Sequence, residues 1–242
     1  MKTHLNFTIQ LENLGNEANV VAQYVYAGMA IQHAASSSKK LLRKLNETHL
    51  FWISSMAAFQ SAAYIAIGRI FDTKSPYNVD ALLNSMEAEI NLFARPALAD
   101  RKRNGLKEDP MWLKDYLDKA NYPTPKDVER LRRRVTKYRE IYDSAFKPVR
   151  NKYIAHREKQ ALTDVQAMFA KGKVKDLWRL VAFFLKLHDV LWQQLHNGRK
   201  PTLRVSTLTI KSAYKKNRSN STPERIVADV KKLMNLIEST NA

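Results

Sequence analysis

Arg150, Asn151 and His156 form a short polar motif whose residue types suit chemistry on a phosphate group. Histidine has an ordinary pKa of about 6.5, so it can accept and donate protons near neutral pH. A guanidinium can hold a phosphate through two hydrogen bonds and stabilise negative charge that builds on it. The amide of Asn151 can orient either partner. The motif therefore predicts acid–base chemistry at a phosphate, with these three residues as the candidate catalytic set.

RNA is the substrate that best fits this chemistry. Its 2′-hydroxyl is an internal nucleophile, so histidine-assisted attack on the adjacent phosphate requires no metal ion, leaves DNA intact and gives a 2′,3′-cyclic phosphate. The chain has no cysteine, and the other histidines lack the spacing of metal ligands. We therefore expect no metal ion and no other cofactor. The alternative is that His156 and Arg150 are ordinary solvated residues of a basic helix.

The spacing within the motif bears on how it could act. Six residues along an ideal helix separate Arg150 and His156 by roughly 9 Å along the axis and about 120° around it. One regular helix would not bring the two side chains together. Either an irregular backbone at Pro148 draws them closer or two copies of the chain converge. An apolar helix such as residues 177–192 offers an interface for a homodimer.

Positive charge is concentrated downstream of residue 100. The chain has 41 Lys and Arg against 23 Asp and Glu, a net charge of +18, yet the first 100 residues carry eight of each sign. A field of this kind attracts polyanions such as nucleic acid. The expected RNA-binding residues are a dense cluster before the motif and three residues within it: Arg130, Arg132, Arg133, Arg134, Lys137, Arg139, Lys152, Tyr153 and Arg157. The alternative is a solvated helix face that serves only solubility.

The elements that must position these residues are helices. Apolar residues at three- and four-residue spacing predict helices over 16–35, 39–72, 79–93, 125–146, 173–195 and 222–237. Residues 5–14 show no clear period. Pro96 should end the third helix, and the following 28 residues are rich in loop signals. Thr124, Pro125 and Asp127 mark a strong helix start.

The C-terminal part is predicted to be separate from the body. Asn197 and Gly198 form a helix-stop signal, which places a helical domain at 1–198 and a basic accessory arm at 199–242. Residues 203–210 alternate as a short strand or an extended segment would. A polar linker over 215–221 then leads into the last amphipathic helix.

The order of these features resembles the HEPN superfamily of prokaryotic RNA-cleaving toxins and defence proteins. Arg150, Asn151 and His156 match its signature, and Trp52 with Arg69 to Asp72 at a helix end resembles the abortive-infection U-type (AbiU-like) branch. The resemblance implies an all-α, HEPN-like helical bundle, a homodimer with two motifs across one cleft, and an endoribonuclease in phage defence or a toxin. An antitoxin or another defence-system protein would be a further partner. The alternatives are a non-catalytic HEPN module that binds RNA or a partner, and an interaction protein whose basic C-terminal helix meets a membrane or antitoxin.

Localisation is predicted from what the sequence lacks. The N-terminus has no signal-peptide pattern, and no stretch reaches the roughly 18 uncharged apolar residues of a membrane span. The most apolar stretch, 177–192, contains three charged residues. We therefore expect a cytoplasmic protein without a transmembrane segment.

Overall fold

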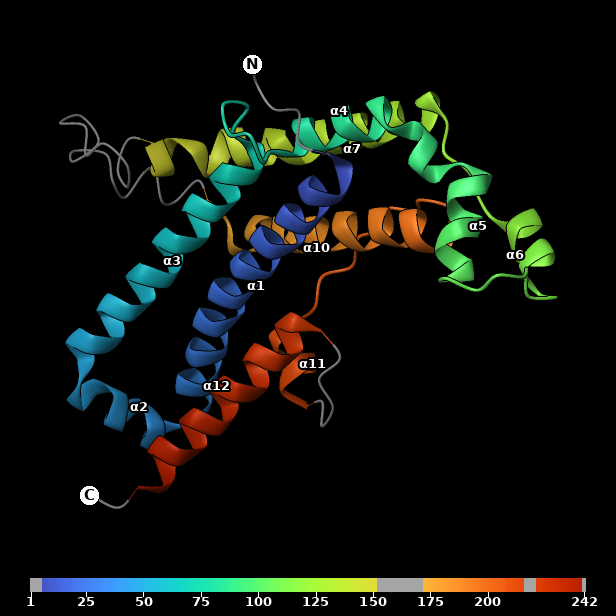
Figure 1. Cartoon of the computed structure of the whole chain (residues 1–242). Helices are drawn as coiled ribbons and strands as arrows, with labels where there is room; N and C mark the ends of the chain where they lie inside the picture. Colours follow the sequence, from blue (N-terminus) through green and yellow to red (C-terminus); the bar gives the residue numbers. More distant parts are fainter. Residues whose placement is uncertain (1–5, 152–171, 216–220, 241–242) are drawn as a thin grey trace. The chain divides into compact units, whose positions relative to one another are not determined.

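The computed structural model describes residues 6–151, 172–215 and 221–240, and it is all-α, as predicted (Figure 1). No strand occurs in these three ranges. The helices are α1 Phe7–Ser37, α2 Lys39–Glu47, α3 His49–Phe71, α4 Val79–Ala88, the 3-10 helix η1 Ile90–Phe93, α5 Arg95–Arg103, α6 Leu113–Lys119, α7 Pro125–Ala145, α10 Val174–Asn197, α11 Ile210–Lys215 and α12 Thr222–Ser239.

Local start and stop signals account for several helix boundaries. The Asn78 side chain accepts hydrogen bonds from the N–H groups of Asp80 and Ala81, each at 2.9 Å, and so caps α4. The α7 start is confirmed at Pro125, where Asp127 accepts hydrogen bonds from the backbone and hydroxyl of Thr124. The stop at Gly198 is also confirmed, with φ at +55°, a conformation that glycine adopts without strain.

Three sequence predictions were wrong in detail. The helix expected over 39–72 is two helices separated at Thr48, which has φ −122° and ψ 40°. The first helix begins at Phe7 rather than Asn16, because Phe7 is buried in the core. Pro96 does not end a helix: it lies in the first turn of α5, where its missing N–H is not needed. The region expected to be loop-rich thus holds α5 and α6.

The described chain divides into two compact units, and α1, α3, α7 and α10 contribute residues to both. The first unit comprises residues 1–16, 69–141 and 183–205. Aromatic contacts join its helices: Phe7 meets Phe93 edge-on at 5.0 Å, and Tyr138 stacks on Phe183 at 3.9 Å. The first contact joins α1 to η1, and the second holds α7 against α10.

The end of α10 is fastened to α5 and α6 within the first unit. Leu98, Leu113 and Leu117 are buried together there. The Tyr116 hydroxyl donates to the carbonyl of Asn197 at 2.9 Å, and the N–H of Asn121 donates to the carbonyl of Gly198 at 2.6 Å. This attachment fixes the point from which residues 199–205 leave the helix.

The second unit comprises residues 17–68, 142–182 and 206–242. Tyr64 meets Phe146 edge-on at 5.3 Å, which links α3 to the segment after α7. Tyr26 donates from its hydroxyl to the carbonyl of Leu208 at 3.3 Å, and burial raises the pKa of Tyr26 to about 12. Residues 203–209 form neither a strand nor a helix, and α11 begins at Ile210. Of the two alternatives for this segment, a short strand or an extended segment, the second is therefore observed.

The last helix packs within this second unit. Val227, Val230 and Met234 are buried on one face of α12. Thr222 donates to the Asn19 side chain at 2.7 Å, and Ser38 donates to Glu238 at the other end of the helix. The predicted separation of residues 199–242 as an accessory arm stays a prediction; a chain ending at Asn197 that folds stably would support it.

Helix α3 differs between its two halves. Its second half contains most of the buried residues, and Ile67 and Ile70 are almost inaccessible. Its first half exposes Leu50, Phe51 and Ile53, each more than 60% accessible. Among the described helices, only α3 has the length and composition that crossing a membrane would require, a test that core helices of soluble proteins also pass. Residues 50–68 carry no charge but include three serines and a glutamine, and α3 meets this test by length and composition alone.

Candidate functional site

Arg150 lies on an irregular backbone just beyond α7. Phe146 is in a turn, residues 147–148 are α-helical, and residues 149–151 form a wider π-type turn. Pro148 has no N–H to donate to the helix ladder, so the predicted irregularity at this position is confirmed. The N–H of Arg150 still reaches the carbonyl of Phe146 at 2.9 Å, which sets where its side chain begins.

The Arg150 side chain passes directly over Gly68 on α3. A Cβ atom at residue 68 would lie 2.7 Å from Nε of Arg150 and 3.1 Å from the hydroxyl oxygen of Tyr142. The first distance is shorter than van der Waals contact allows, and the second is tighter than most contacts of a Cβ atom. Only glycine therefore lets the guanidinium approach the helix backbone this closely, beside a tyrosine that is itself buried.

Asn151 also positions the guanidinium of Arg150, through a side-chain hydrogen bond. Nη1 of Arg150 donates to Oδ1 of Asn151 at 2.9 Å in a partly buried setting. Adjacent side chains rarely meet on a regular helix, and here they meet in the wider turn of residues 149–151. Arg150 is thus positioned by Gly68 and Asn151 together, all within the second unit.

Four of the predicted site residues lie outside the described residues: His156, Lys152, Tyr153 and Arg157. The structure therefore brings together Arg150 and Asn151 of the candidate catalytic set. The role of His156 stays a prediction.

The predicted cationic cluster on α7 divides between two faces of the helix. Arg132 donates to Asn84 and Glu87, both at 2.8 Å. Arg139 donates to Asp80 at 2.6 Å and lies over the Phe71 ring at 5.6 Å. These two arginines tie α7 to α4 and the end of α3. Their charges are already paired within the fold, which weighs against the binding role predicted for them.

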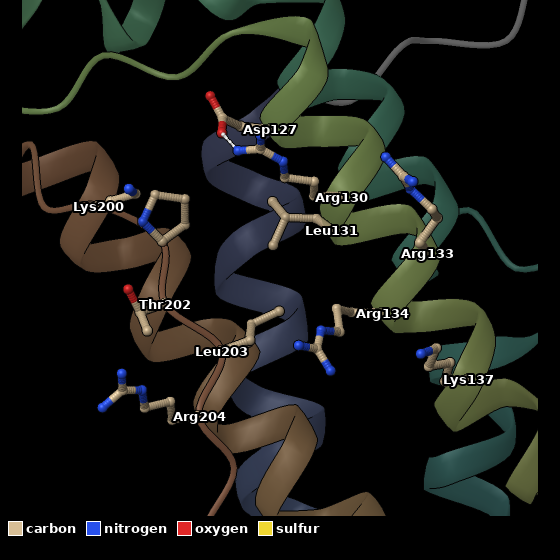
Figure 2. A pocket seen from close by; sticks show the side chains of 11 residues that line it. Asp127, Arg130, Leu131, Arg133, Arg134, Lys137, Lys200, Thr202, Leu203 and Arg204 are labelled. Atoms are coloured by element: carbon tan, nitrogen blue, oxygen red, sulfur yellow. Dashed lines mark hydrogen bonds and ion pairs between the residues drawn. The ribbon is translucent and has the colours of Figure 1, made fainter.

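The other α7 cations line a groove of about 530 Å³ beside residues 200–204 (Figure 2). Its cationic residues are Arg130, Arg133, Arg134, Lys137, Lys200 and Arg204. We call this the basic groove. On an ideal helix the four α7 residues fall within about 100° of arc, roughly opposite Arg132 and Arg139.

Lys200 and Arg204 were missed by reasoning from the sequence. The available signal was the basic excess after residue 198, where ten Lys and Arg stand against three Asp and Glu. Residues 199–205 belong to the same unit as residues 125–141 of α7. The hydrogen bond from the N–H of Asn121 to the carbonyl of Gly198 holds the chain two residues before Lys200. Lys200 then lines the basic groove together with residues of α7.

Two histidines of α10 are packed rather than arranged as ligands. His188 lies against Gly15, whose Cβ position would be 2.6 Å from its Nε2. Burial lowers the pKa of His188, and the nearby Asp189 opposes this only in part. His196 lies against the Trp192 ring at 4.5 Å, and burial lowers its pKa as well. In the part of the chain that the structure describes, no three His, Asp or Glu side chains gather as a metal site.

Comparison with known families gives one result. The AbiU2 family of HEPN proteins matches residues 5–238, essentially the whole chain. Neither characterised proteins nor solved structures give a match. The match spans the helices that carry Arg150 and the basic groove. The chain therefore belongs to the HEPN AbiU2 family.

Proposed function

We propose that the chain is a metal-independent endoribonuclease that acts in abortive infection, with Arg150, Asn151 and His156 as its catalytic residues. The observation that carries this proposal is the fixed guanidinium of Arg150, held over Gly68 and bonded to Asn151. A donor that stabilises a transition state acts best when it is in place before the charge builds, because no reorganisation is then required. A merely solvated arginine would not need this arrangement.

The proposed reaction is an internal transesterification. His156 takes the proton of the 2′-hydroxyl, whose oxygen attacks the adjacent phosphorus. Arg150 stabilises the added negative charge, while Asn151 keeps its guanidinium oriented. The bond from phosphorus to the 5′-oxygen then breaks, and that oxygen receives a proton from a histidinium. The products are a 2′,3′-cyclic phosphate and a free 5′-hydroxyl.

The test is cleavage of total RNA by the purified protein in the presence of EDTA. We expect the wild type to cut RNA, to leave DNA intact and to produce 2′,3′-cyclic ends. His156→Ala should be slower by about 10² to 10⁴-fold, the usual contribution of acid–base catalysis. Equal activity in His156→Ala would contradict the catalytic assignment.

We further propose that two copies of the chain form the active species. Arg150 and His156 would diverge on a regular helix, so a second copy can supply the complementary residue across a cleft. The surface first expected to form the interface, helix 177–192, is wrong for this role. Its apolar residues Leu180, Phe183, Phe184 and Leu187 are inaccessible within the chain.

The first half of α3 is the better candidate interface. Leu50, Phe51 and Ile53 are exposed there, with Leu42 of α2 nearby in sequence and also exposed. Large exposed apolar surfaces of this kind mark interaction sites. In sedimentation we expect a dimer that Phe51→Ser with Ile53→Ser converts to monomer. Leu236→Ser, on an equally exposed residue of α12, should stay dimeric. Wild-type protein that sediments only as a monomer would contradict the proposal.

The second candidate function is a HEPN module that binds RNA or a partner without turnover. The exposed cations of the basic groove favour it, since they could bind a polyanion without any catalytic residue. RNA binding by wild type and His156→Ala alike, with cleavage by neither, would support this reading. A cytoplasmic location and a toxin-like role with a protein antitoxin remain parts of the proposal.

A further inference from the structure

The basic groove has the lining of a site for an extended polyanion. It lies wholly within the first unit, between one face of α7 and residues 200–204 (Figure 2). Six of its lining residues are cationic and only Asp127 is acidic. Hydrogen bonds from Thr124 and the charge of Arg130 lower the pKa of Asp127, so this carboxylate is already engaged.

Among the residues that the structure describes, four of the six cations have no acidic partner. Arg130 pairs with Asp127 at 3.1 Å, and Arg133 pairs with Glu129 at 3.4 Å. Within the described ranges no carboxylate pairs with the other four, which are Arg134, Lys137, Lys200 and Arg204. All four are exposed. Uncompensated like charges that face one groove repel one another, and an anionic ligand would relieve that repulsion.

The uncharged part of the lining shows how such a ligand would be recognised. Leu131, Pro201, Thr202 and Leu203 complete the groove, and its lining contains no aromatic ring. Sequence-tolerant binding through bases requires rings on which the bases stack. The basic groove is therefore suited to contact phosphates rather than bases.

Cationic surface continues beyond the basic groove. Two further hollows border Lys200. One is lined by Lys119, Arg199 and Tyr116, and the other by Arg199 and by Lys186, which pairs with Asp189 at 2.8 Å. A small ligand with one phosphate group would occupy only the groove or one of these hollows. A chain with a repeating phosphate could occupy them in succession, because the cations follow the chain segment that begins at Arg199.

We propose that the basic groove binds the phosphate backbone of RNA without regard to its sequence, separately from the Arg150 motif. Lys200 and Arg204 join Arg134 and Lys137 in this role. That the natural ligand is RNA rests on the proposed function; that the groove binds phosphates rests on its own lining. The groove then supplies affinity, and the motif supplies the distinction between RNA and DNA through the 2′-hydroxyl.

The test is binding of a 2′-O-methyl RNA, which cannot be cleaved, measured by fluorescence anisotropy against salt concentration. The variant is Arg134→Gln with Lys200→Gln and Arg204→Gln. We expect affinity to fall about tenfold or more and the slope of log Kd against log salt to fall by about 2, since each single-strand phosphate contact contributes about 0.7. Single-stranded DNA of the same sequence should lose affinity equally.

A matched control removes three cations elsewhere. Lys39, Lys40 and Arg43 are exposed on α2 in the second unit, and changing all three to Gln alters net charge by the same amount. Unchanged RNA affinity in the groove variant, or an equal loss in the control, would overturn the proposal. If the groove variant binds RNA as well as the wild type does, an acidic protein would be the remaining polyanion that fits the groove. Because the probe cannot be cleaved, failure of the proposed enzymatic activity would appear separately, as cleavage that His156→Ala does not reduce.

Discussion

Arg150 and the arginines of the basic groove are held in opposite ways. Arg150 is partly buried, crosses the backbone of α3 at Gly68 and donates to Asn151. Arg134 and Arg204 are exposed, and neither pairs with a carboxylate in the described part of the chain. A guanidinium fixed at one place suits charge stabilisation at one phosphorus. Exposed cations suit a ligand that presents many phosphates and tolerates many positions.

Arg139 shows a third use of the same residue type on the helix that lines the groove. It is bonded to Asp80 and lies over the Phe71 ring. The difference among Arg150, Arg134 and Arg139 lies in their partners rather than in their side chains. A dense run of arginines can therefore contain both structural residues and candidate binding residues. The contacts of each side chain, and not its residue type, tell the two kinds apart.

Among substitutions that test this comparison of arginines, the largest expected effect is on the rate of cleavage by Arg150→Lys. Lysine keeps the charge but cannot reproduce the planar fork, so we expect loss of about 10² to 10³-fold in a single-turnover assay. Arg134→Lys should leave RNA affinity almost unchanged, because a diffuse contact depends on charge alone. If lysine is tolerated equally well at residues 150 and 134, the distinction between the fixed guanidinium of Arg150 and the exposed cations of the basic groove does not hold.

Gly68→Ala tests the position of Arg150 without changing its chemistry. The added methyl group would meet Nε at 2.7 Å and must displace the guanidinium. A misplacement of about 1 Å can cost roughly 10²-fold in rate, so we expect a loss between about tenfold and a hundredfold. RNA affinity should not change.

The control for that substitution is Gly28→Ala in α1. Its Cβ would approach the terminal methyl of Met56 at 3.1 Å, a flexible end that can move aside, and would meet Sδ of Met56 and the Phe59 ring at ordinary contact distances of 3.7 and 3.9 Å. Cleavage by Gly28→Ala should match the wild type. If Gly68→Ala is equally active, Arg150 does not depend on its contact with α3.

Arg139→Gln should reduce stability rather than binding. The variant loses a partly buried, charge-assisted hydrogen bond to Asp80, which we expect to cost about 1–2 kcal/mol in the free energy of unfolding. Urea denaturation followed by circular dichroism measures this, and anisotropy should show unchanged RNA affinity. Weakened binding without loss of stability would mean that the two faces of α7 are not functionally distinct.

The smallest expected effect concerns pH and His188. Its pKa is lower in the folded chain than in the unfolded chain, so the unfolded state binds more protons below about pH 6.5. Stability should therefore fall as pH drops from that value through the folded pKa of His188. His188→Gln should flatten this dependence in urea denaturation at several pH values. A dependence as steep as that of the wild type would assign the acid sensitivity to another group.

The pH dependence also bears on the catalytic role proposed for His156. A fall in cleavage at low pH would be expected both from protonation of His156 and from unfolding linked to His188. His188→Gln removes the contribution of His188, and His188→Gln with His196→Gln also removes that of His196, whose pKa is likewise lowered by burial. A fall in cleavage that persists in the double variant is then the contribution expected of His156.

The sequence by itself determined the helical class, the family resemblance and the starts of α2, α4, α7 and α12. Periodicity and caps are local, so Pro125 began a helix and Gly198 ended one as expected. Local rules also explain what was missed in α5, since Pro96 is compatible with a first helical turn as well as with a stop. The alternative chosen there was wrong, although the signal was present.

Only the tertiary structure decided which charged residues are available to a ligand. Arg132 and Arg134 are two residues apart, yet one meets Glu87 on α4 and the other faces the basic groove. No sequence pattern brings Lys200 beside Arg134 or Gly68 beneath Arg150. These proximities depend on contacts between residues more than 60 positions apart. A charge acts through its distance to other groups, and those distances are set by packing rather than by spacing along the chain.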